Sequence, residues 1–155
     1  MKTKEFYMKK AIKQAYKAEE LGEVPIGAII VKDGVVISSA FNKRNFSCDA
    51  TQHAEILAIK KACKKMGDWR LDGAEMYVTL EPCPMCAGAI VNARIKKVYF
   101  GAYESKSGCA ESKYPVLTDN GLNHSTEFIG GVEQEICANI IKNYFKSKRI
   151  KKSLD

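Results

Sequence analysis

The sequence is poor in histidine and lacks a long uninterrupted apolar run. Its 155 residues include two histidines, His53 and His124, and its first twenty residues are rich in lysine and glutamate. A secretory signal needs an apolar segment, and a membrane-spanning helix needs about 20 predominantly apolar residues. We therefore expect neither a signal peptide nor a membrane span, and a cytoplasmic location.

Without an export signal, the six cysteines are not expected to form disulfide bonds. Metal binding or free thiols is the better interpretation for such a chain. Two of the cysteines lie three positions apart, in the 82–86 run PCPMC. The others occur singly, and we expect them to be small core or surface residues: Cys48, Cys63, Cys109 and Cys137.

The 82–86 run predicts the start of a helix, because Pro84 suits the first helical position. Free N–H groups and the helix dipole stabilise thiolates there, and Zn²⁺ binds thiolate and imidazole readily. Cys83, Cys86 and His53 would supply three ligands, and no fourth candidate stands beside either motif. The sequence therefore predicts an open zinc site, of the kind that leaves one position to water.

A C-x-x-C pair alone is weak evidence, because redox sites and structural zinc sites also use it. A thioredoxin-like role would place the pair early, after a first strand, and would leave the 53–55 run HAE without a part. Glu55 lies roughly 200° from His53 around an ideal helix, which favours acid–base chemistry over a second ligand. The alternative is a first-turn glutamate favoured by the helix dipole. For Glu81, a place beside the site and a surface charge both stay open.

Apolar periodicity predicts alternating helices and strands in one domain, residues 1–155. Helices are expected at 4–21, 52–66, from 84 onward and at 132–148, and strands at 25–31, 35–40, 76–80, 98–102 and 128–129. This alternation indicates an α/β fold, with a mixed central sheet of about five strands and helices on both faces. The loop from 103 to about 125 is long for a compact domain, and such loops are usually functional or mobile.

The net charge of +7 favours an anionic partner, although many proteins that never touch nucleic acid share such a balance. From about residue 142 the chain combines lysines and Arg149 with Tyr144 and Phe145. This mixture suits phosphates and stacked bases. The alternative is a solvated final helix with a frayed basic tail.

The 53–55 and 82–86 runs match the H-x-E and P-C-x-x-C signature of the zinc-dependent nucleoside and base deaminases. From about residue 6 to 149 the chain resembles the bacterial tRNA adenosine deaminases, in the runs GEVPIGA (22–28), YVTLEPC (77–83), MCAGAI (85–90), RI (94–95) and NH (123–124). The resemblance implies a three-layer α/β/α fold of the cytidine-deaminase type. It also implies a homodimer that hydrolyses the wobble adenosine of a tRNA anticodon loop to inosine and releases ammonia.

The resemblance further implies roles for individual residues. One zinc ion per subunit would be held by His53, Cys83 and Cys86, and Glu55 would move protons to the adenine ring and the departing amino group. Substrate contacts would come from Asn42, Ala54, Glu104, Asn123, Phe145 and Arg149. Three departures from the family pattern lie in substrate-facing or neighbouring loops, at Gln52, Glu104 and 111–115. The reaction therefore carries over more directly than the choice of tRNA.

Two other functions stay open. The same metal site could serve a deaminase of a free base or nucleoside, such as guanine or cytosine, although a free base offers the basic C-terminal segment no phosphates. A non-catalytic, zinc-stabilised RNA-binding module would instead have a closed site with four protein ligands.

Overall fold

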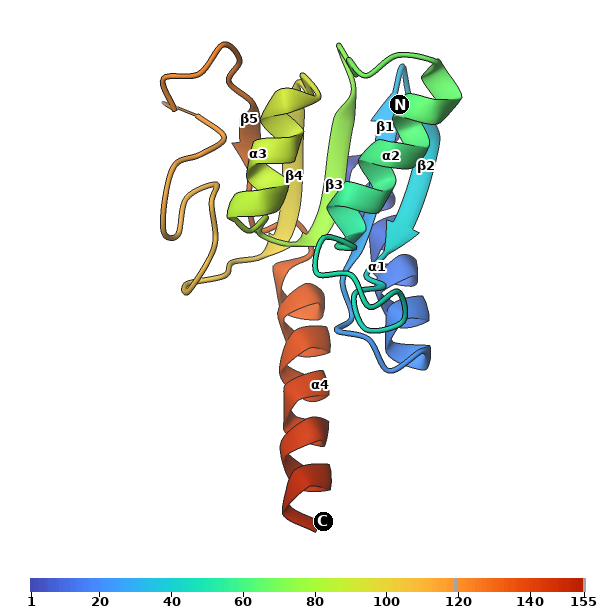
Figure 1. Ribbon diagram of the computed structural model, residues 1–155, viewed down its shortest axis with the longest axis vertical. Coiled ribbons are helices and arrows are strands. Elements are labelled where there is room, and N and C mark those ends of the chain that lie inside the picture. The colour runs from blue at the N-terminus through green and yellow to red at the C-terminus, as the bar shows by residue number, and fades with distance from the viewer. Residues whose placement is uncertain (119, 155) are drawn as a thin grey trace.

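The fold is given by a computed structural model that describes residues 1–118 and 120–154 (Figure 1). The elements run in the order α1 (Lys4–Glu20), β1 (Gly27–Lys32), β2 (Val35–Phe41), α2 (Ala54–Met66), β3 (Glu75–Leu80), α3 (Pro84–Asn92), β4 (Lys97–Ala102), β5 (Glu127–Ile129) and α4 (Gln134–Leu154). Within these described ranges, the helices are too short or too polar to cross a membrane.

The described strands form one mixed sheet in the order β2-β1-β3-β4-β5. β1 pairs antiparallel with both β2 and β3, whereas β3 pairs parallel with β4, and β4 with β5. The β1–β2 hairpin turns at Asp33 and Gly34, whose φ angles are 51° and 76°. Positive φ at both positions is the backbone form that an Asp-Gly hairpin turn favours.

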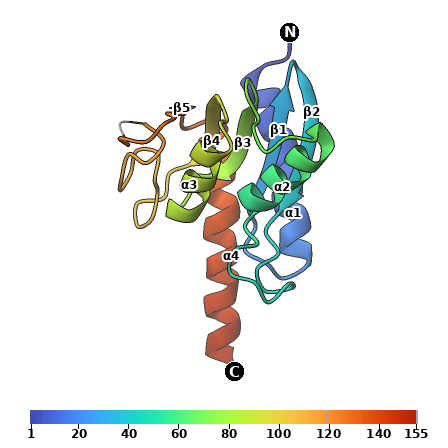
Figure 2. The same cartoon turned by 45° about the horizontal axis from the view of Figure 1, so that its top comes forward.

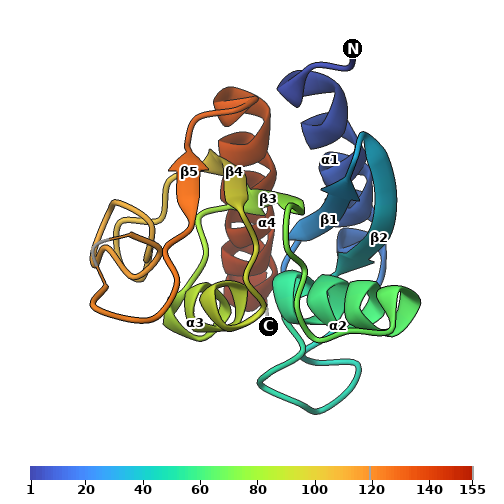
Figure 3. The same cartoon turned by 90° about the horizontal axis from the view of Figure 1, so that it is seen from above.

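Helices cover both faces of the sheet and complete three layers, as Figure 3 shows from above. α2 and α3 pack against the face that carries Ile30 and Val78, and α1 and α4 against the face that carries Ile29 and Tyr77. Successive residues of a strand point to opposite faces, so both faces of β1 and β3 are apolar. The three-layer α/β/α fold with a five-stranded mixed sheet is confirmed.

Both outer edges of the sheet have features that interrupt regular pairing. Along β2, the register with β1 shifts between Ile30 and Val31, and Lys61 Nζ donates to the backbone carbonyl of Ser39 at 2.9 Å. At the other edge β5 is three residues long and begins with the exposed Glu127.

The largest departure from the sequence prediction is at the C-terminal end. α4 begins at Gln134 and continues to Leu154, beyond the predicted end at 148, so the basic segment is helical rather than frayed. Its buried residues are Cys137 and Ile140, both in its first half. Figures 1 and 2 show the second half extending away from the sheet. Lysine and arginine have high helix propensity, which suits an exposed helix end.

Candidate metal centre and active site

The three predicted ligands come from two helix starts on one face of the sheet. His53 is the N-cap of α2, with φ −75° and ψ 154°, one position before the first turn in which it was predicted. Cys83 is the N-cap of α3, Pro84 begins that helix, and Cys86 lies in its first turn. α2 and α3 begin at the same end of the sheet (Figure 1), which brings the two motifs together.

The two nitrogen–sulfur distances in the group match those around a tetrahedral zinc ion. His53 Nδ1 lies 3.6 Å from Cys83 Sγ and 3.5 Å from Cys86 Sγ, and all three atoms lie within 4.8 Å of one another. Zinc–nitrogen bonds of about 2.05 Å and zinc–sulfur bonds of about 2.3 Å, at a tetrahedral angle, put nitrogen and sulfur about 3.6 Å apart. Among residues 1–118 and 120–154 this group has three members, so these side chains could hold a metal ion in an open site.

Hydrogen bonds within the group shift the pKa values of its members, and they favour the metal-binding form of Cys83. The hydrogen bonds with Cys86 and then with His53 outweigh burial and lower the pKa of the Cys83 thiol to about 4. The same hydrogen bond with Cys83 raises the pKa of Cys86, and burial adds to that rise. The hydrogen bond with Cys83 also raises the pKa of His53. One thiolate, that of Cys83, is therefore favoured, and thiolate is the form that binds metal. Metal binding would have to displace the protons of Cys86 and His53.

Glu55 is a buried carboxyl group in the first turn of α2, with 4% of its surface exposed. Within the described residues, its Oε1 is a buried oxygen without a hydrogen-bond partner. Burial raises the pKa of this carboxyl group to about 7. A solvated first-turn glutamate would show neither feature, and an unpartnered buried polar atom needs a functional or structural reason.

Glu81 is a buried carboxylate that ties the loop after β4 to the metal motif. Its Oε1 accepts the N–H of Glu104 at 3.0 Å and the hydroxyl of Ser112, and its Oε2 accepts the N–H groups of Ala110, Glu111 and Ser112 at 3.2, 2.8 and 2.9 Å. Burial opposes ionisation, but these hydrogen bonds hold the pKa of Glu81 below its usual value. With 2% of its surface exposed, Glu81 is not the surface charge that the sequence left open.

Glu23 has a similar role in the loop before α2, and sequence reasoning did not identify it. It is 1% exposed, and its oxygens accept the N–H groups of Asn45 at 3.0 Å and Phe46 at 2.7 Å. The N–H of Lys43 donates to the Gln52 carbonyl at 3.0 Å, which joins this loop to the start of α2. The one available signal was an acidic residue within the GEVPIGA run, between a helix end and a strand.

Three predicted substrate contacts lie on segments that adjoin the metal motifs or are hydrogen-bonded to residues beside them. Asn42 is buried, and its Nδ2 donates to the Val24 carbonyl at 3.3 Å. Ala54, also buried, is the first residue of α2 and directly follows His53. Glu104 is half-buried, and its backbone binds Glu81 as described above.

The other predicted contacts are solvent-exposed. Asn123 lies in the loop before β5, and Phe145 and Arg149 lie on the projecting half of α4. His124, the second histidine, contacts the Ile95 carbonyl through Nε2 at 2.9 Å. It therefore supports the loop rather than the metal group.

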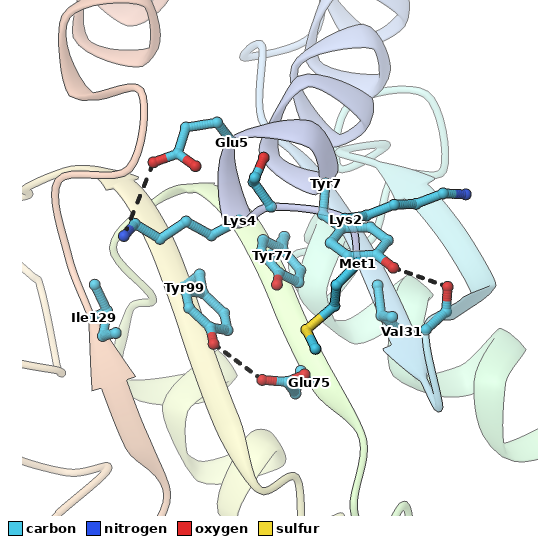
Figure 4. Close-up of a pocket in the computed structure, with 12 residues that line it drawn as sticks. Met1, Lys2, Lys4, Glu5, Tyr7, Val31, Glu75, Tyr77, Tyr99 and Ile129 are labelled. Carbon is cyan, nitrogen blue, oxygen red and sulfur yellow. Dashed lines mark hydrogen bonds and ion pairs between the residues drawn. The ribbon is translucent and has the colours of Figure 1, made fainter.

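A cavity of about 830 Å³ opens on the opposite face of the sheet and is separate from the metal group. Figure 4 shows Tyr7, Tyr77 and Tyr99 along it, with Glu75 accepting a hydrogen bond from the Tyr99 hydroxyl at 3.1 Å. The rings of Tyr77 and Tyr99 stack with centroids 4.5 Å apart. None of the predicted site residues lines this cavity. We therefore do not assign the active site to it, although it is large.

Comparison with known proteins identifies the family. A family model described as MafB19-like deaminase matches residues 2–149. The tRNA-specific adenosine deaminase of Bacillus subtilis strain 168 is 50% identical over 148 residues, which cover 96% of this chain and 92% of that protein. The chain belongs to the tRNA-specific adenosine deaminase family.

Solved structures agree with membership of the tRNA-specific adenosine deaminase family. One, described as a study of A-to-I editing by tRNA:A34 deaminases at the wobble position, is 42% identical with a TM-score of 0.84, over 86% of this chain and 97% of that one. A guanine deaminase from Bacillus subtilis is 43% identical but matches 66% of each chain with a TM-score of 0.63. The match to the structure from the tRNA deaminase study is thus longer and closer in shape than the match to the guanine deaminase.

Proposed function

We propose that this protein hydrolyses adenosine to inosine at the wobble position of a tRNA anticodon loop and releases ammonia. The convergence of His53, Cys83 and Cys86 beside the buried Glu55 is the observation that carries the proposal. The names of the near full-length relatives support the tRNA substrate. The proposal treats residues 1–155 as one deaminase domain in the cytoplasm.

The metal in this proposal is one zinc ion per subunit, held by the histidine nitrogen and the two sulfurs. The 3.5 and 3.6 Å nitrogen–sulfur distances support this assignment. When bound, zinc activates water as a nucleophile at neutral pH. Because the group has three protein members in the described chain, the arrangement supports a catalytic role over a closed structural site.

Glu55 is proposed as the proton carrier of the reaction. Its carboxyl group would take a proton from the attacking water and pass it to N1 of the adenine ring. It would then take the second proton from the hydroxyl group formed on carbon 6 and give it to the amino group, so that the carbon–nitrogen bond breaks and ammonia leaves as the carbonyl of inosine forms. A buried oxygen that has no hydrogen-bond partner among the described residues is free to make these transfers.

The anticodon loop is proposed to lie across the end of the sheet where α2 and α3 begin. Asn42, Ala54 and Glu104 would contact it close to the metal group, and Asn123, Phe145 and Arg149 farther out. α4 projects beyond this same end of the sheet (Figure 1), and its exposed second half carries the lysines and arginine that suit phosphates. The protein is further proposed to act as a homodimer, which sedimentation of the purified protein would test.

A single assay separates the leading functions. Purified, zinc-loaded protein is incubated with an anticodon stem-loop carrying adenosine at the wobble position and, separately, with free guanine. We expect inosine in the RNA and no xanthine. The 43% identity with a guanine deaminase makes guanine the relevant competitor. Xanthine without inosine would contradict the proposal and favour a free-base deaminase.

A further inference from the structure

The segment 104–112 is wrapped around a single side chain, the carboxylate of Glu81. Four backbone N–H groups and one hydroxyl from this segment point at its two oxygens. At Gly108 the backbone approaches so closely that a Cβ would collide with the carboxyl group of Glu81. The segment can therefore pack around Glu81 only because Glu81 is a carboxylate and because residue 108 is a glycine.

The division of donors between the two oxygens requires a carboxylate rather than an amide. Oε2 accepts three backbone N–H groups, so an amide NH₂ at that position would face only donors. A glutamine would therefore turn its NH₂ toward the Oε1 position. There the Ser112 hydroxyl can accept a hydrogen bond, but the Glu104 N–H can only donate. Replacing the carboxylate by an amide should release the Glu104 end of the segment and keep the other end.

The same segment is also fixed to the metal motif. Glu81 directly precedes Pro82, and the Pro82 carbonyl accepts the N–H of Cys109 at 2.8 Å. The N–H of Glu81 in turn donates to the Ala102 carbonyl at 2.9 Å, at the end of β4. The position of the segment is therefore set within two residues of the ligand Cys83.

We propose that Glu81 is a positioning residue that sets the 104–112 segment for binding of the polynucleotide substrate. The inference rests on the proposed function. The segment and its start carry exposed Tyr103 and Lys106 together with Glu104, and exposed aromatic and cationic side chains suit bases and phosphates. In the described part of the chain, the carboxylate of Glu81 makes its hydrogen bonds with the 104–112 segment and not with the metal group, so its effect should appear in substrate binding rather than in the chemical step.

The test compares E81Q with wild type by amide hydrogen exchange and by steady-state kinetics on the anticodon stem-loop. We expect exchange at the Glu104 amide to rise about tenfold or more, because a hydrogen bond to a charged group is lost. Exchange at 111 and 112 should change less. We expect KM to rise roughly tenfold, with kcat within about twofold and with bound zinc unchanged.

The matched control is E127Q, which removes one exposed negative charge at the start of β5 and leaves the Glu81 carboxylate in place. Glu127 pairs with Lys97, at the end of β4 away from Glu81, so exchange at Glu104 and KM should both stay unchanged. An equal rise of KM in E127Q would mean that net charge, not the hydrogen bonds, controls binding, and would overturn the proposal. S112A, which removes one hydroxyl donor from an exposed residue, should raise KM by a smaller factor and serves if E81Q does not fold.

The two readouts also separate this inference from the proposed function. Unchanged exchange at Glu104 in E81Q would overturn the positioning role, whatever the substrate. Faster exchange with unchanged KM would overturn its link to binding. If wild-type protein formed no inosine in the stem-loop, the proposed function would fail, and the exchange pattern would still decide whether Glu81 holds the segment.

Discussion

The face of the sheet under α2 and α3 and the face under α1 and α4 are built from different side chains. Alanines such as Ala58 and Ala87 pack the first face, beside the histidine, the two cysteines and the buried Glu55. The second face carries a row of tyrosines, Tyr7, Tyr77 and Tyr99, beside an open cavity. Small side chains let two helix starts approach each other closely, whereas the tyrosine rings line an open cavity.

This difference indicates that chemistry and support are separated by the sheet. Substitutions on the metal face should change turnover or metal content, and comparable substitutions on the tyrosine face should change the free energy of unfolding alone. α4 is an exception to this separation. It packs on the tyrosine face but projects beyond the sheet at the end where the metal group lies.

The largest difference between the faces is expected from the same substitution at two buried cysteines. C86A removes a proposed ligand, so bound zinc and deamination should both fall to background. C137A, on the other face, removes a packed sulfur and should cost about 1 kcal/mol of unfolding free energy, with zinc and turnover kept. Zinc content and inosine formation measure both variants. Loss of zinc in C137A would break the division.

The next effect concerns turnover without metal loss. E55Q keeps the size of the side chain but cannot take up a proton as a carboxylate does. We expect kcat to fall roughly 10²–10⁴-fold, while bound zinc stays at the wild-type level. Inosine formation and metal analysis on the same sample decide it, and wild-type turnover would remove Glu55 from the mechanism.

A smaller effect, on stem-loop affinity, is expected from substitutions in the projecting half of α4. The double variant K146Q/R149Q removes two exposed charges from its projecting half, and K9Q/K13Q removes two exposed charges from α1. Stem-loop affinity should fall in the first variant, and its dependence on salt should become shallower by about 1.4 logarithmic units per decade. The α1 variant should change neither. Equal changes in both would reduce the role of α4 to overall charge.

The smallest effect is expected in the tyrosine cavity. Y99F removes the hydroxyl that donates to Glu75 and leaves the ring stacked on Tyr77. Chemical denaturation should show a loss of about 1 kcal/mol. Inosine formation should be unchanged, and a fall in turnover would mean that the cavity communicates with the metal face.

Features that depend on neighbouring residues in the chain could be predicted from the sequence. The hairpin at Asp33 and Gly34, the helix start at Pro84 and the spacing of Cys83 and Cys86 are local patterns, and the structure has each of them. The approach of His53 to these cysteines was inferred from the combination of two motifs. It could not have been derived from either motif alone.

Features that depend on distant backbone atoms could not be predicted. Glu81 accepts hydrogen bonds from residues 23 to 31 positions away, and Glu23 from residues 22 and 23 positions away. No periodicity in the sequence encodes which buried carboxylate will meet which loop. The length of α4 was also misjudged, because an exposed basic helix has no apolar pattern to mark its end.

The interrupted edges of the sheet affect how copies of the chain can associate. An unpaired strand edge is a template for a strand from another molecule, and proteins avoid such growth with charges, bulges and short edge strands. Here Lys61 donates a hydrogen bond to a backbone carbonyl of β2, and the pairing of β2 with β1 is irregular. The strand at the opposite edge, β5, is three residues long. Stacking of the sheet into fibrils is thereby discouraged, and when the protein is concentrated, helices and loops are left as the surfaces for self-association.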